Sequence, residues 1–580
     1  MKSLNLTTTF LVLFCLNALS QSTGFEWANS IISSGMVSPS SVETDSNGNI
    51  FVSGEFTGRA DFDPGEDSLF LESYGHDDIF ISKYNILGQL IWAFNIGEDY
   101  NDVCNSMTLD EDFNIYITGR FARTVDFDPG NGTHELSTTG SDDIFIAKYD
   151  SAGNFKWAYS MGLLNATDEG TSVTTDKDGN VLVTGWFQGT VDFDPGEGVH
   201  NLTTTRTSCF ILKLSDDGNF IWAEKINSTG GSVEGHTIKT DQYNNVYISG
   251  MFEANADFNP GTGTYNMEPD EEYAAFLVKL DKNGNFKWAL QPGGHAINTN
   301  LDKKRPFDID KDGNIYLAFD FSNTADFDPS EEETLLSADG AWADLIIQKL
   351  DSLGNLIWVK QIGGDNNDEF GGMFLDKSGN MFITGFINGT VDFDPGDGVY
   401  EISAREDWEV ALFVAKYNSE GDFVWGHPIN WKEPDSSWPY GKGFDITLDP
   451  AGNVITVGQF SGSYNFNPDG VPSVLTSTPD MYSGFMLKLN GISSGTNTLT
   501  TNDFIHFYPN PFSNKITISA TQQLQNAELW LHSVSGQTII HKNNVSGSNI
   551  ELVTGNIPAG IYFLEIKQKD NQFVGKVMKQ

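Results

Sequence analysis

Basic residues are scarce in this chain, and that scarcity argues against several classes of partner. The 580 residues contain 33 Lys and Arg against 79 Asp and Glu, which gives a formal net charge of −46. A surface this negative repels phosphate backbones and anionic headgroups, so we expect neither nucleic-acid binding nor polybasic membrane attachment. Hydrophobic residues still make up 39% of the chain and aromatic residues 13%, which indicates a folded protein rather than a disordered acidic polymer.

Cysteines and long apolar runs are also lacking. The chain has 3 cysteines, of which Cys104 and Cys209 stand at unrelated positions, and we expect both to be buried single thiols. Without a CxxC pair or a Cys/His cluster, the sequence indicates no structural zinc site. No apolar run reaches the roughly 18 residues that a transmembrane helix requires.

Motifs of the common enzyme classes are missing as well. The chain has no HExxH, no P-loop and no dinucleotide-binding fingerprint. One G-x-S-x-G match begins at Gly491, but it lies in a polar stretch rather than at a strand-to-helix elbow, so we interpret it as a chance match. The sequence therefore favours a non-catalytic function.

The first residues have the pattern of an export signal. Lys2 gives a basic start, residues 10–16 are apolar, and the small residues Ala18 and Ser20 precede Gln21. This pattern predicts a signal peptide over residues 1–20, and therefore a secreted protein without a transmembrane segment.

One unit of about 65–73 residues occurs seven times along the chain. Three markers define it: a DFDPG motif, a tryptophan, and an apolar segment that ends in Lys-Tyr or Lys-Leu. The first marker or a close variant begins at Asp61, Asp126, Asp192, Asp257, Asp326, Asp392 and Asn465, and the tryptophans are Trp27, Trp92, Trp157, Trp222, Trp288, Trp358 and Trp425.

Each unit predicts four short strands. In the third unit the turn KDGN joins TSVTTD to VLVTGWF, and the turn SDDGN joins FILKL to FIWAEKI, with the DFDPG loop between the two pairs. Gly and Asn accept the positive φ that such hairpin turns require. Runs that are apolar on both faces indicate sheets stacked on neighbouring sheets, so we expect an all-β fold: a seven-bladed β-propeller of four-stranded blades over residues 21–490. The units resemble the bacterial β-propeller repeat family called SBBP.

The ends of the repeat array predict how the ring closes. The tryptophan strand around Trp27 has no unit before it, and the seventh unit has no tryptophan strand after it. We therefore expect the N-terminal strand to complete the seventh blade. The tryptophan strands are then outermost, and the DFDPG loops lie with the connections between blades on the face where propeller ligands usually bind.

The composition changes near the C-terminus. From Leu499 onward there are 6 lysines and 5 acidic residues, and residues 491–503 are small and polar, as expected of a linker. Residues 504–580 contain HFYPNPF, LWLHSVSGQTII and NIPAGIYFLEIK, whose alternation predicts a small C-terminal β-sandwich. These motifs resemble the type A C-terminal sorting domain of the Bacteroidetes type IX secretion system. The resemblance implies that the secretion machinery is a partner, and that the protein is released outside the cell or held at its outer surface.

The DFDPG loops are the first candidate site. On an extended segment the two aspartates of the motif point the same way, and the phenylalanine between them points to the other side. Two interpretations stay open: structural turns in which each carboxylate accepts amides of its own loop, or Ca²⁺ sites completed by further oxygens. Asn replaces Asp in the fourth and seventh units, which weakens a uniform metal site. The candidate calcium ligands are Asp61, Asp63, Asp126, Asp128, Asp192, Asp194, Asp326, Asp328, Asp392 and Asp394.

The second candidate site is a ligand-binding surface made by residues that break the repeat. In an insertion of the seventh unit, Trp431, Trp438 and Tyr440 either stack on a sugar or peptide or fill a groove between blades. Near the predicted axis, His236 and Arg305 are either ligand contacts or ordinary loop side chains.

These features together predict a secreted β-propeller that binds an extracellular polysaccharide or protein without catalysis, with Ca²⁺ as the one candidate cofactor. The alternative is a propeller glycoside hydrolase or polysaccharide lyase. The near-identity of the units counts against it, because the blades of an enzyme usually diverge around the axis. A structural matrix protein with no ligand is the third interpretation.

Overall fold

The computed structural model describes residues 24–138, 141–163, 166–269, 273–293, 307–330, 332–338, 342–404, 409–431, 440–468, 470–490, 505–508, 512–533, 538–555, 557–558, 560–568 and 571–579. The chain divides into two compact units, Met1–Gly491 and Ile492–Gln580. Within the described ranges all regular structure is β-strand, so no helix there could cross a membrane. The expected signal peptide, 1–20, and linker, 491–503, lie outside them.

Seven sheets, each built on four antiparallel strands, make up most of the described part of the first unit, and in six of them these strands follow sequence order. Sheet 1 holds β2 (Val37–Thr44), β3 (Ile50–Phe56), β6 (Asp78–Tyr84) and β7 (Leu90–Ile96). Sheet 2 holds β8 (Val103–Leu109), β9 (Ile115–Phe121), β12 (Asp143–Tyr149) and β13 (Phe155–Met161). Sheet 3 holds β14 (Glu169–Thr175), β15 (Val181–Phe187), β18 (Ser208–Leu214) and β19 (Phe220–Ser228). Sheet 4 holds β20 (Val233–Thr240), β21 (Val246–Phe252), β24 (Ala274–Leu280) and β25 (Phe286–Leu290).

The remaining three sheets follow the same order. Sheet 5 holds β26 (Phe307–Ile309), β27 (Ile315–Phe321), β30 (Asp344–Leu350) and β31 (Leu356–Ile362). Sheet 6 holds β32 (Glu369–Leu375), β33 (Met381–Asn388), β36 (Val410–Tyr417) and β37 (Phe423–Trp431). Sheet 7 holds β38 (Tyr440–Leu448), β39 (Val454–Ser461), β42 (Ser483–Asn490) and, as its fourth strand, β1 (Gly24–Ser33). This arrangement of sheets is propeller-like.

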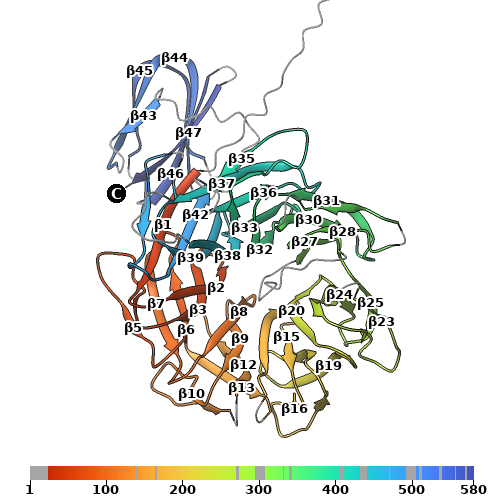
Figure 1. Ribbon diagram of the computed structural model, residues 1–580. Helices are drawn as coiled ribbons and strands as arrows, with labels where there is room; N and C mark the ends of the chain where they lie inside the picture. Colours follow the sequence, from red (N-terminus) through yellow and green to blue (C-terminus); the bar gives the residue numbers. More distant parts are fainter. Residues whose placement is uncertain are drawn as a thin grey trace, which may run out of the picture. The chain divides into compact units, whose positions relative to one another are not determined.

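The fourth strand of sheet 7 comes from the other end of the unit. Strand β1 pairs antiparallel with β42, with Ala28 opposite Leu487, so the red N-terminal strand lies beside the blue strand β42 (Figure 1). Side-chain packing also joins the last sheet to the first, since Val457 and Met486 share one core cluster with Val42 and Val52.

The DFDPG segments contain more regular structure than the sequence predicted. Each motif lies between two short paired strands, and not in a plain loop. Three of these hairpins extend a sheet, because β4 pairs with β1, β22 with β19 and β40 with β37. The pairs are β4 (Arg59–Asp61) with β5 (Phe70–Glu72), β10 (Thr124–Asp126) with β11 (Glu135–Ser137), β16 (Thr190–Asp192) with β17 (Asn201–Thr203), β22 (Ala256–Asp257) with β23 (Asn266–Met267), β28 (Thr324–Asp326) with β29 (Leu335–Ser337), β34 (Thr390–Asp392) with β35 (Glu401–Ser403), and β40 (Ser463–Asn465) with β41 (Val474–Thr476).

Neighbouring sheets cover both faces of the central strands. All seven residues of β6, β12, β18 and β30 are buried, whereas outer strands such as β13 keep exposed positions. This explains the apolar runs, because a strand covered on both faces has no solvent side on which to place polar residues. The two described cysteines, Cys104 and Cys209, are buried free thiols, which confirms that expectation.

The repeated lysine links six of the seven sheets to the next one. Lys83 Nζ of sheet 1 donates to the Ser151 carbonyl of sheet 2 at 3.1 Å, and Lys148, Lys213, Lys279 and Lys349 make the equivalent bond one sheet further on. In the same way, Lys488 of sheet 7 donates to the Ile86 carbonyl of sheet 1 at 3.3 Å. The tryptophan of the unit shares this acceptor in three places, for example Trp27 Nε1 to Ile86 at 3.4 Å. These lysine clasps account for the lysine marker, and in three sheets they include the tryptophan marker.

The strands of the second unit form one connected five-stranded sheet, and the expected sandwich stays a prediction. The strands are β43 (Ile505–Tyr508), β44 (Lys515–Ser533), β45 (Thr538–Val553), β46 (Gly560–Gln568) and β47 (Asn571–Lys579), in the order β43-β44-β46-β47 with β45 also paired to β44. The long strand β44 has register shifts between Ser519 and Ala527. Leu524, Leu529 and Leu564 are among the residues of its core.

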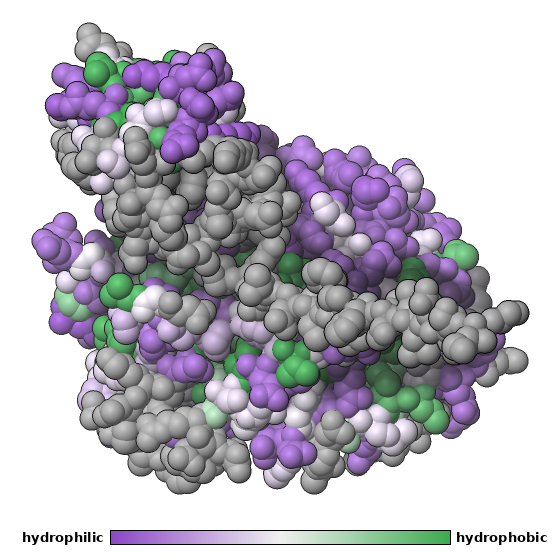
Figure 2. Space-filling view, turned by 90° about the horizontal axis from the view of Figure 1, so that it is seen from above, coloured by the Kyte–Doolittle hydropathy of each residue, from purple (hydrophilic) through white to green (hydrophobic). Residues whose placement is uncertain are grey.

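On the face shown in Figure 2, most of the coloured surface is hydrophilic, and the apolar patches are small and scattered. Single exposed apolar side chains of this kind are normal for a folded protein.

Candidate functional site

The DFDPG carboxylates accept hydrogen bonds from their own loops. Asp61 Oδ1 accepts the amides of Asp63 at 3.2 Å and Leu69 at 3.0 Å, and Asp63 Oδ1 accepts the Gly65 amide at 2.8 Å. The same three bonds recur in the second to sixth loops, and two of them recur in the seventh, where Asn465 Oδ1 accepts the Asn467 and Ser473 amides at 3.1 Å. An asparagine oxygen accepts amides as an aspartate does, which explains the Asn variants.

This geometry has the features of Asx-type turns. The other candidate ligands, Asp126, Asp128, Asp192, Asp194, Asp326, Asp328, Asp392 and Asp394, occupy equivalent places. Among the described residues, no three His, Cys, Asp or Glu side chains are grouped as a metal would require. A calcium site would need oxygens beyond each aspartate pair, and it stays a prediction.

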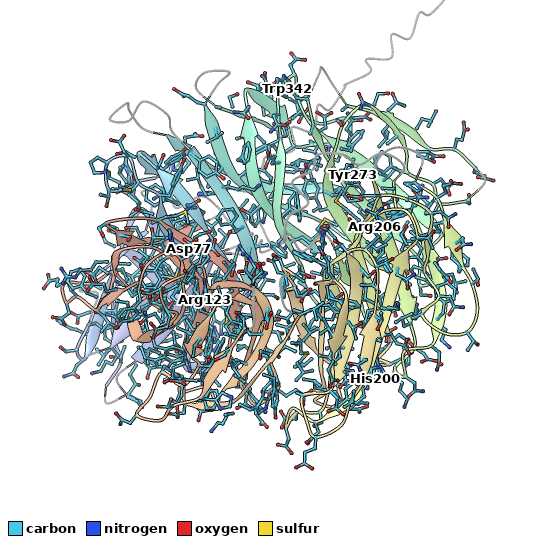
Figure 3. The ribbon with its side chains drawn as sticks, turned by 60° about the horizontal axis from the view of Figure 1, so that its bottom comes forward. Asp77, Arg123, His200, Arg206, Tyr273 and Trp342 are labelled. Atoms are coloured by element: carbon cyan, nitrogen blue, oxygen red, sulfur yellow. The ribbon has the colours of Figure 1, made fainter. Side chains whose placement is uncertain are left out.

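Several hairpins pack on outer strands at the edge of the unit. His200 Nε2 lies 3.0 Å from the Ala223 carbonyl and its ring centroid is 4.9 Å from that of Phe220 (Figure 3). His134 and Phe155, Tyr265 and Phe286, and Tyr400 and Phe423 form equivalent pairs. These side chains hold the hairpins in place.

The predicted ligand-binding surface falls largely outside the described residues. Trp438 and Arg305 lie there, and of Trp431 the structure gives the backbone, which pairs with Tyr464 at the end of β37. Tyr440 begins β38, half-buried, with its ring centroid 5.4 Å from that of Tyr482. Burial raises the pKa of Tyr440 to about 12. Tyr440 therefore packs against a neighbouring aromatic ring, and its role in ligand stacking stays a prediction.

His236 occupies a special backbone position in β20. A β-bulge between Gly235 and Thr237 leaves His236 without a partner on β21. The first strands of five other sheets carry a bulge at the same place, and a bulge redirects the side chain of the extra residue. The six bulge positions are Ser40, Asn105, Thr171, His236, Gly371 and Phe444.

A glycine of the second strand permits each bulge. A Cβ atom at Gly119 would collide with the Val103 carbonyl, and at Gly250 with the Glu234 carbonyl. The same applies to Gly54, Gly185, Gly385 and Gly458. In sheet 5 the equivalent residue is Phe319, and no bulge occurs in its described strand β26.

The side chains at and beside the bulges differ from sheet to sheet, although the rest of the unit is nearly constant. We call the residue two places before each bulge residue its flanking position. The residue opposite the flanking position on the second strand of the sheet is called the paired position. The flanking positions are Ser38, Val103, Glu169, Glu234, Glu369 and Lys442, and the paired positions are Glu55, Arg120, Trp186, Met251, Phe386 and Gln459. Charged and aromatic residues are thus concentrated where the repeat varies.

These positions form a polar network. Arg120 pairs with Asp142, and its Nε lies 3.5 Å from Glu169 Oε2, while Asn105 Nδ2 donates to Glu169 Oε1 at 2.6 Å. Lys442 Nζ donates to Glu369 Oε2 at 2.6 Å. Such a set of fixed donors and acceptors suits recognition of a polar ligand.

His236 adds a titratable group to this set. Its Nε2 lies 3.8 Å from Glu234 Oε2, so the two side chains form an ion pair when the imidazole is protonated. Glu234 stays partly exposed, with 40% of its side-chain surface accessible, so this pair can meet a ligand.

A groove of about 670 Å³ opens between strand β1, the first hairpin and the end of the last hairpin. Its lining includes Arg59, Asp61, Asp63, Phe70 and Leu475. Two of the predicted calcium ligands therefore face a cavity large enough for a small ligand.

The comparisons with known families match two parts of the chain. Residues 506–580 match the secretion system C-terminal sorting domain, and residues 161–186 match the β-propeller repeat. The chain therefore combines an SBBP β-propeller repeat with a type IX sorting domain.

The sorting domain indicates a secreted protein and points to the type IX secretion machinery as a partner, which confirms the family resemblance. The matched β-propeller repeat ends just before Phe187 and contains β14, so it includes Glu169 and the bulged Thr171.

Two curated proteins are similar to this chain at low identity. An uncharacterized WD repeat-containing protein, L264, of Acanthamoeba polyphaga mimivirus is 23% identical over 545 residues, covering 80% of this chain and 38% of that protein. The regulatory protein FlaEY of Caulobacter vibrioides is 24% identical over 149 residues, covering 25% of this chain and 15% of that protein. The chain thus spans well under half the length of both relatives.

Among solved structures, a protein of unknown function from Bacteroides caccae aligns with a TM-score of 0.30 and 10% identity. The alignment covers 61% of this chain and 91% of that one. A likeness at this level carries no functional argument.

Sequence reasoning placed His236 among the repeat-breaking residues but missed Asn105, Arg120 and Glu169 of the bulge network. It also missed Arg59 and Phe70 of the groove. The signal for Asn105, Arg120, Arg59 and Phe70 is the same, because each departs from its counterparts when the seven units are aligned with one another. Glu169 gives no such signal, since Glu234 and Glu369 occupy the same position.

Proposed function

We propose that the mature protein is a closed seven-bladed β-propeller that binds an extracellular polysaccharide or protein without catalysis, either released or held at the cell surface. Its domains are a signal peptide at 1–20, the propeller at 21–490, a linker at 491–503 and the sorting domain at 504–580. The ligand meets the axial mouth, which is the surface formed by the bulge positions and their flanking and paired positions.

Contacts between the last and first sheets support the closed ring. Asp445 Oδ2 of sheet 7 accepts the Val42 amide of sheet 1 at 2.9 Å. Between earlier sheets a serine fills this place, as when Ser41 Oγ accepts the Met107 amide at 3.2 Å. The Lys488 clasp to Ile86 adds a second link of the repeating kind.

The observation that carries the binding function is the divergence at the mouth. Core residues, turns and clasps repeat almost unchanged, whereas the six bulge positions and the six paired positions each hold six different residue types, and the six flanking positions hold four. Packing alone would favour the same residue in each near-identical unit. A single asymmetric ligand at the axis requires different contacts from each sheet.

An array of extracellular polysaccharides and surface proteins tests this proposal. The full chain is applied with and without Ca²⁺, together with the double variant Glu234→Gln/His236→Ala and the control Lys156→Met, whose side chain is 43% exposed on an outer strand. Loss of a buried polar contact at a mouth of this kind weakens binding about tenfold or more, whereas the control binds like the parent. A chain that retains no component of the array would be a structural matrix protein instead.

An enzymatic function is the second candidate. The near-identity of the units counted against an enzyme, but the side chains of the axial mouth differ from sheet to sheet, which favours it. Glu169 and Glu369 are carboxylates on different sheets at flanking positions, and a glycoside hydrolase requires such a pair. Release of reducing ends or unsaturated products by the full chain, abolished by Glu169→Gln or Glu369→Gln, would establish it.

Calcium binding by the DFDPG loops is a separate part of the proposal. A cation that binds only the folded state raises the unfolding midpoint by mass action, by about 2.7 kcal/mol of stability at a concentration 100 times its Kd. We expect a higher midpoint in millimolar Ca²⁺ than in EDTA if the loops are cation sites. Equal midpoints would leave the aspartates as turn residues.

A further inference from the structure

We infer that the groove beside the first hairpin is a second binding site, for an acidic saccharide. The inference rests on the proposed function in one respect, namely that the secreted propeller binds extracellular polysaccharide. The site is distinct from the axial mouth, because its walls are β1, the β4–β5 hairpin and the residues around Leu475 and Thr478.

The first hairpin departs from the other hairpins at this groove. In five hairpins a hydroxyl pair joins the two short strands, as between Thr124 Oγ1 and Ser137 Oγ at 2.8 Å. In the first hairpin the equivalent pair is Arg59 and Glu72. A hydroxyl pair is enough to join the two short strands of a hairpin. Packing therefore does not require an arginine at position 59.

Arg59 is held ready for a ligand. Its Cζ lies 3.7 Å from the ring centroid of Phe70, so a cation–π contact holds the guanidinium against the ring. Among the residues that the structure describes, Arg59 forms no ion pair, although Glu72 stands opposite it on β5 and acids outnumber bases 79 to 33 in this chain. A guanidinium fixed in this way offers two parallel N–H donors to a carboxylate or a sulfate with little further loss of side-chain entropy.

The aspartates of the groove provide acceptors beside this donor. Asp61 and Asp63 each use Oδ1 for the amides of their own loop. Their Oδ2 atoms have no hydrogen-bond donor within the described part of the chain, and both residues line the groove. Carboxylate oxygens accept hydrogen bonds from sugar hydroxyls, whereas they repel a second carboxylate.

Exposed apolar surface completes the site. Phe70 is 47% exposed and Ile32 is 43% exposed, and both line the groove. Glutamate, asparagine, leucine and valine do not offer a comparable ring, and the counterparts of Phe70 are Glu135, Asn201, Asn266, Leu335, Glu401 and Val474. An acidic sugar carries one anionic group, several hydroxyls and an apolar C–H face, which matches the donor, acceptors and apolar surface of the groove.

The full chain is titrated by calorimetry with trigalacturonic acid, with neutral galactotriose and with a sulfated galactotriose. Binding of trigalacturonic acid at least tenfold tighter than galactotriose identifies the carboxylate as the recognised group. If the sulfated sugar binds and trigalacturonic acid does not, the recognised acidic group is a sulfate. In that case Arg59→Thr and Phe70→Asn should also weaken binding of the sulfated sugar at least tenfold. Equal affinity for the neutral sugar overturns the inference.

The repeat itself supplies variants that should fold. Arg59→Thr and Phe70→Asn introduce residues that sister hairpins already carry, and each should weaken binding of the acidic sugar at least tenfold. The matched control is Arg123→Asn, because Arg123, labelled in Figure 3, also stacks on an aromatic ring, Tyr100, at 4.8 Å but is not among the residues that line the groove. Its substitution should leave binding unchanged, and its counterpart in the fifth hairpin is already Asn323.

Three outcomes separate this inference from the proposed function. If the chain binds polysaccharide but Arg59→Thr has no effect, the groove assignment is wrong and the axial mouth stands. If the chain binds nothing on the array, both fail. If a glutamate-rich peptide displaces trigalacturonic acid from the groove with higher affinity, the occupant is a peptide and the saccharide assignment is wrong.

Discussion

Three buried aspartates, Asp102, Asp168 and Asp368, stand just before the first strand of their sheets. Each accepts one amide from the connection that precedes it and one amide from the residue that follows or ends the second strand. Asp368 accepts the amides of Gly364 at 3.2 Å and Asn388 at 3.3 Å. Burial raises the pKa of Asp102 to about 7, that of Asp168 to about 6 and that of Asp368 to about 8. For Asp368, the nearby Asp344 carboxylate raises the pKa further.

These shifts predict that the protein is more stable in mild acid than in mild base. A carboxyl whose folded-state pKa is raised contributes stability that is complete below its ordinary pKa, and that is lost as pH rises through the raised value. The free energy of unfolding should therefore fall between about pH 5 and pH 9. In Asp368→Asn, which keeps an acceptor oxygen but does not titrate, the fall should be smaller by on the order of 3 kcal/mol.

Chemical denaturation at several pH values measures this effect. Asp61→Asn, at a partly exposed turn, is measured beside Asp368→Asn as a second variant that removes one carboxylate. Parallel pH profiles for the parent and Asp368→Asn would show that Asp368 is ionised in the folded state, contrary to the expectation.

At the scale of elements, the lysine clasps connect strands of neighbouring sheets. Lys213 Nζ lies 2.7 Å from Asp176 Oδ2 and 3.3 Å from the Lys282 carbonyl, and its side chain is 5% exposed. Although burial alone would raise the pKa of Asp176, hydrogen bonds from Lys213 and Asn180 hold that pKa below its ordinary value. The clasp thus satisfies a buried carboxylate at a hairpin turn.

Removal of one clasp should destabilise the protein strongly. Lys213→Met leaves the Asp176 carboxylate buried beside an apolar side chain, and loss of one partner of a buried pair costs about 3 kcal/mol or more. Lys156→Met, which breaks the exposed pair with Asp150, should cost less than about 1 kcal/mol. Thermal and urea unfolding compare the two variants, and similar small losses in both would show that the clasp does not stabilise the sheet contact.

Much of the architecture was predictable from the sequence because its causes are local. Gly-Asn turns and doubly apolar runs predicted the strands of each unit, and the turns at Asp176 and Asp310 are hairpin turns as expected, with Asp176 Oδ1 accepting the Asp178 and Asn180 amides at 2.9 Å. The short DFDPG hairpins were missed because strands of two or three residues leave no periodicity. The register shifts inside β44 were missed because they have no signature in the alternation of apolar residues.

The candidate site was less predictable, because it depends on tertiary contacts. A bulge at His236 or Asn105 arises where a first strand passes close to a glycine of the next, and neither residue marks a bulge in its own segment. The lysine marker was visible seven times, but its acceptor lies on the next sheet, about 70 residues further along the chain.

At the scale of the whole molecule, a nearly constant frame presents variable side chains. Clasps, cores and turns repeat from sheet to sheet and link the seventh sheet to the first. The connections that lead into the third strands also vary, for example at Asp77, Arg206, Tyr273 and Trp342 (Figure 3). The sorting domain indicates that this frame acts after secretion.

Hydrogen exchange with and without the ligand found on the array tests the central claim most directly, because it locates the bound surface. The account predicts slower exchange at β14, β20, β32 and β38 and at the strands paired with them, with the Gly-Asn turns unchanged. The Glu234→Gln/His236→Ala variant should lose this protection at the same ligand concentration. Protection confined to the Gly-Asn turns would contradict the assignment of the binding surface to the axial mouth.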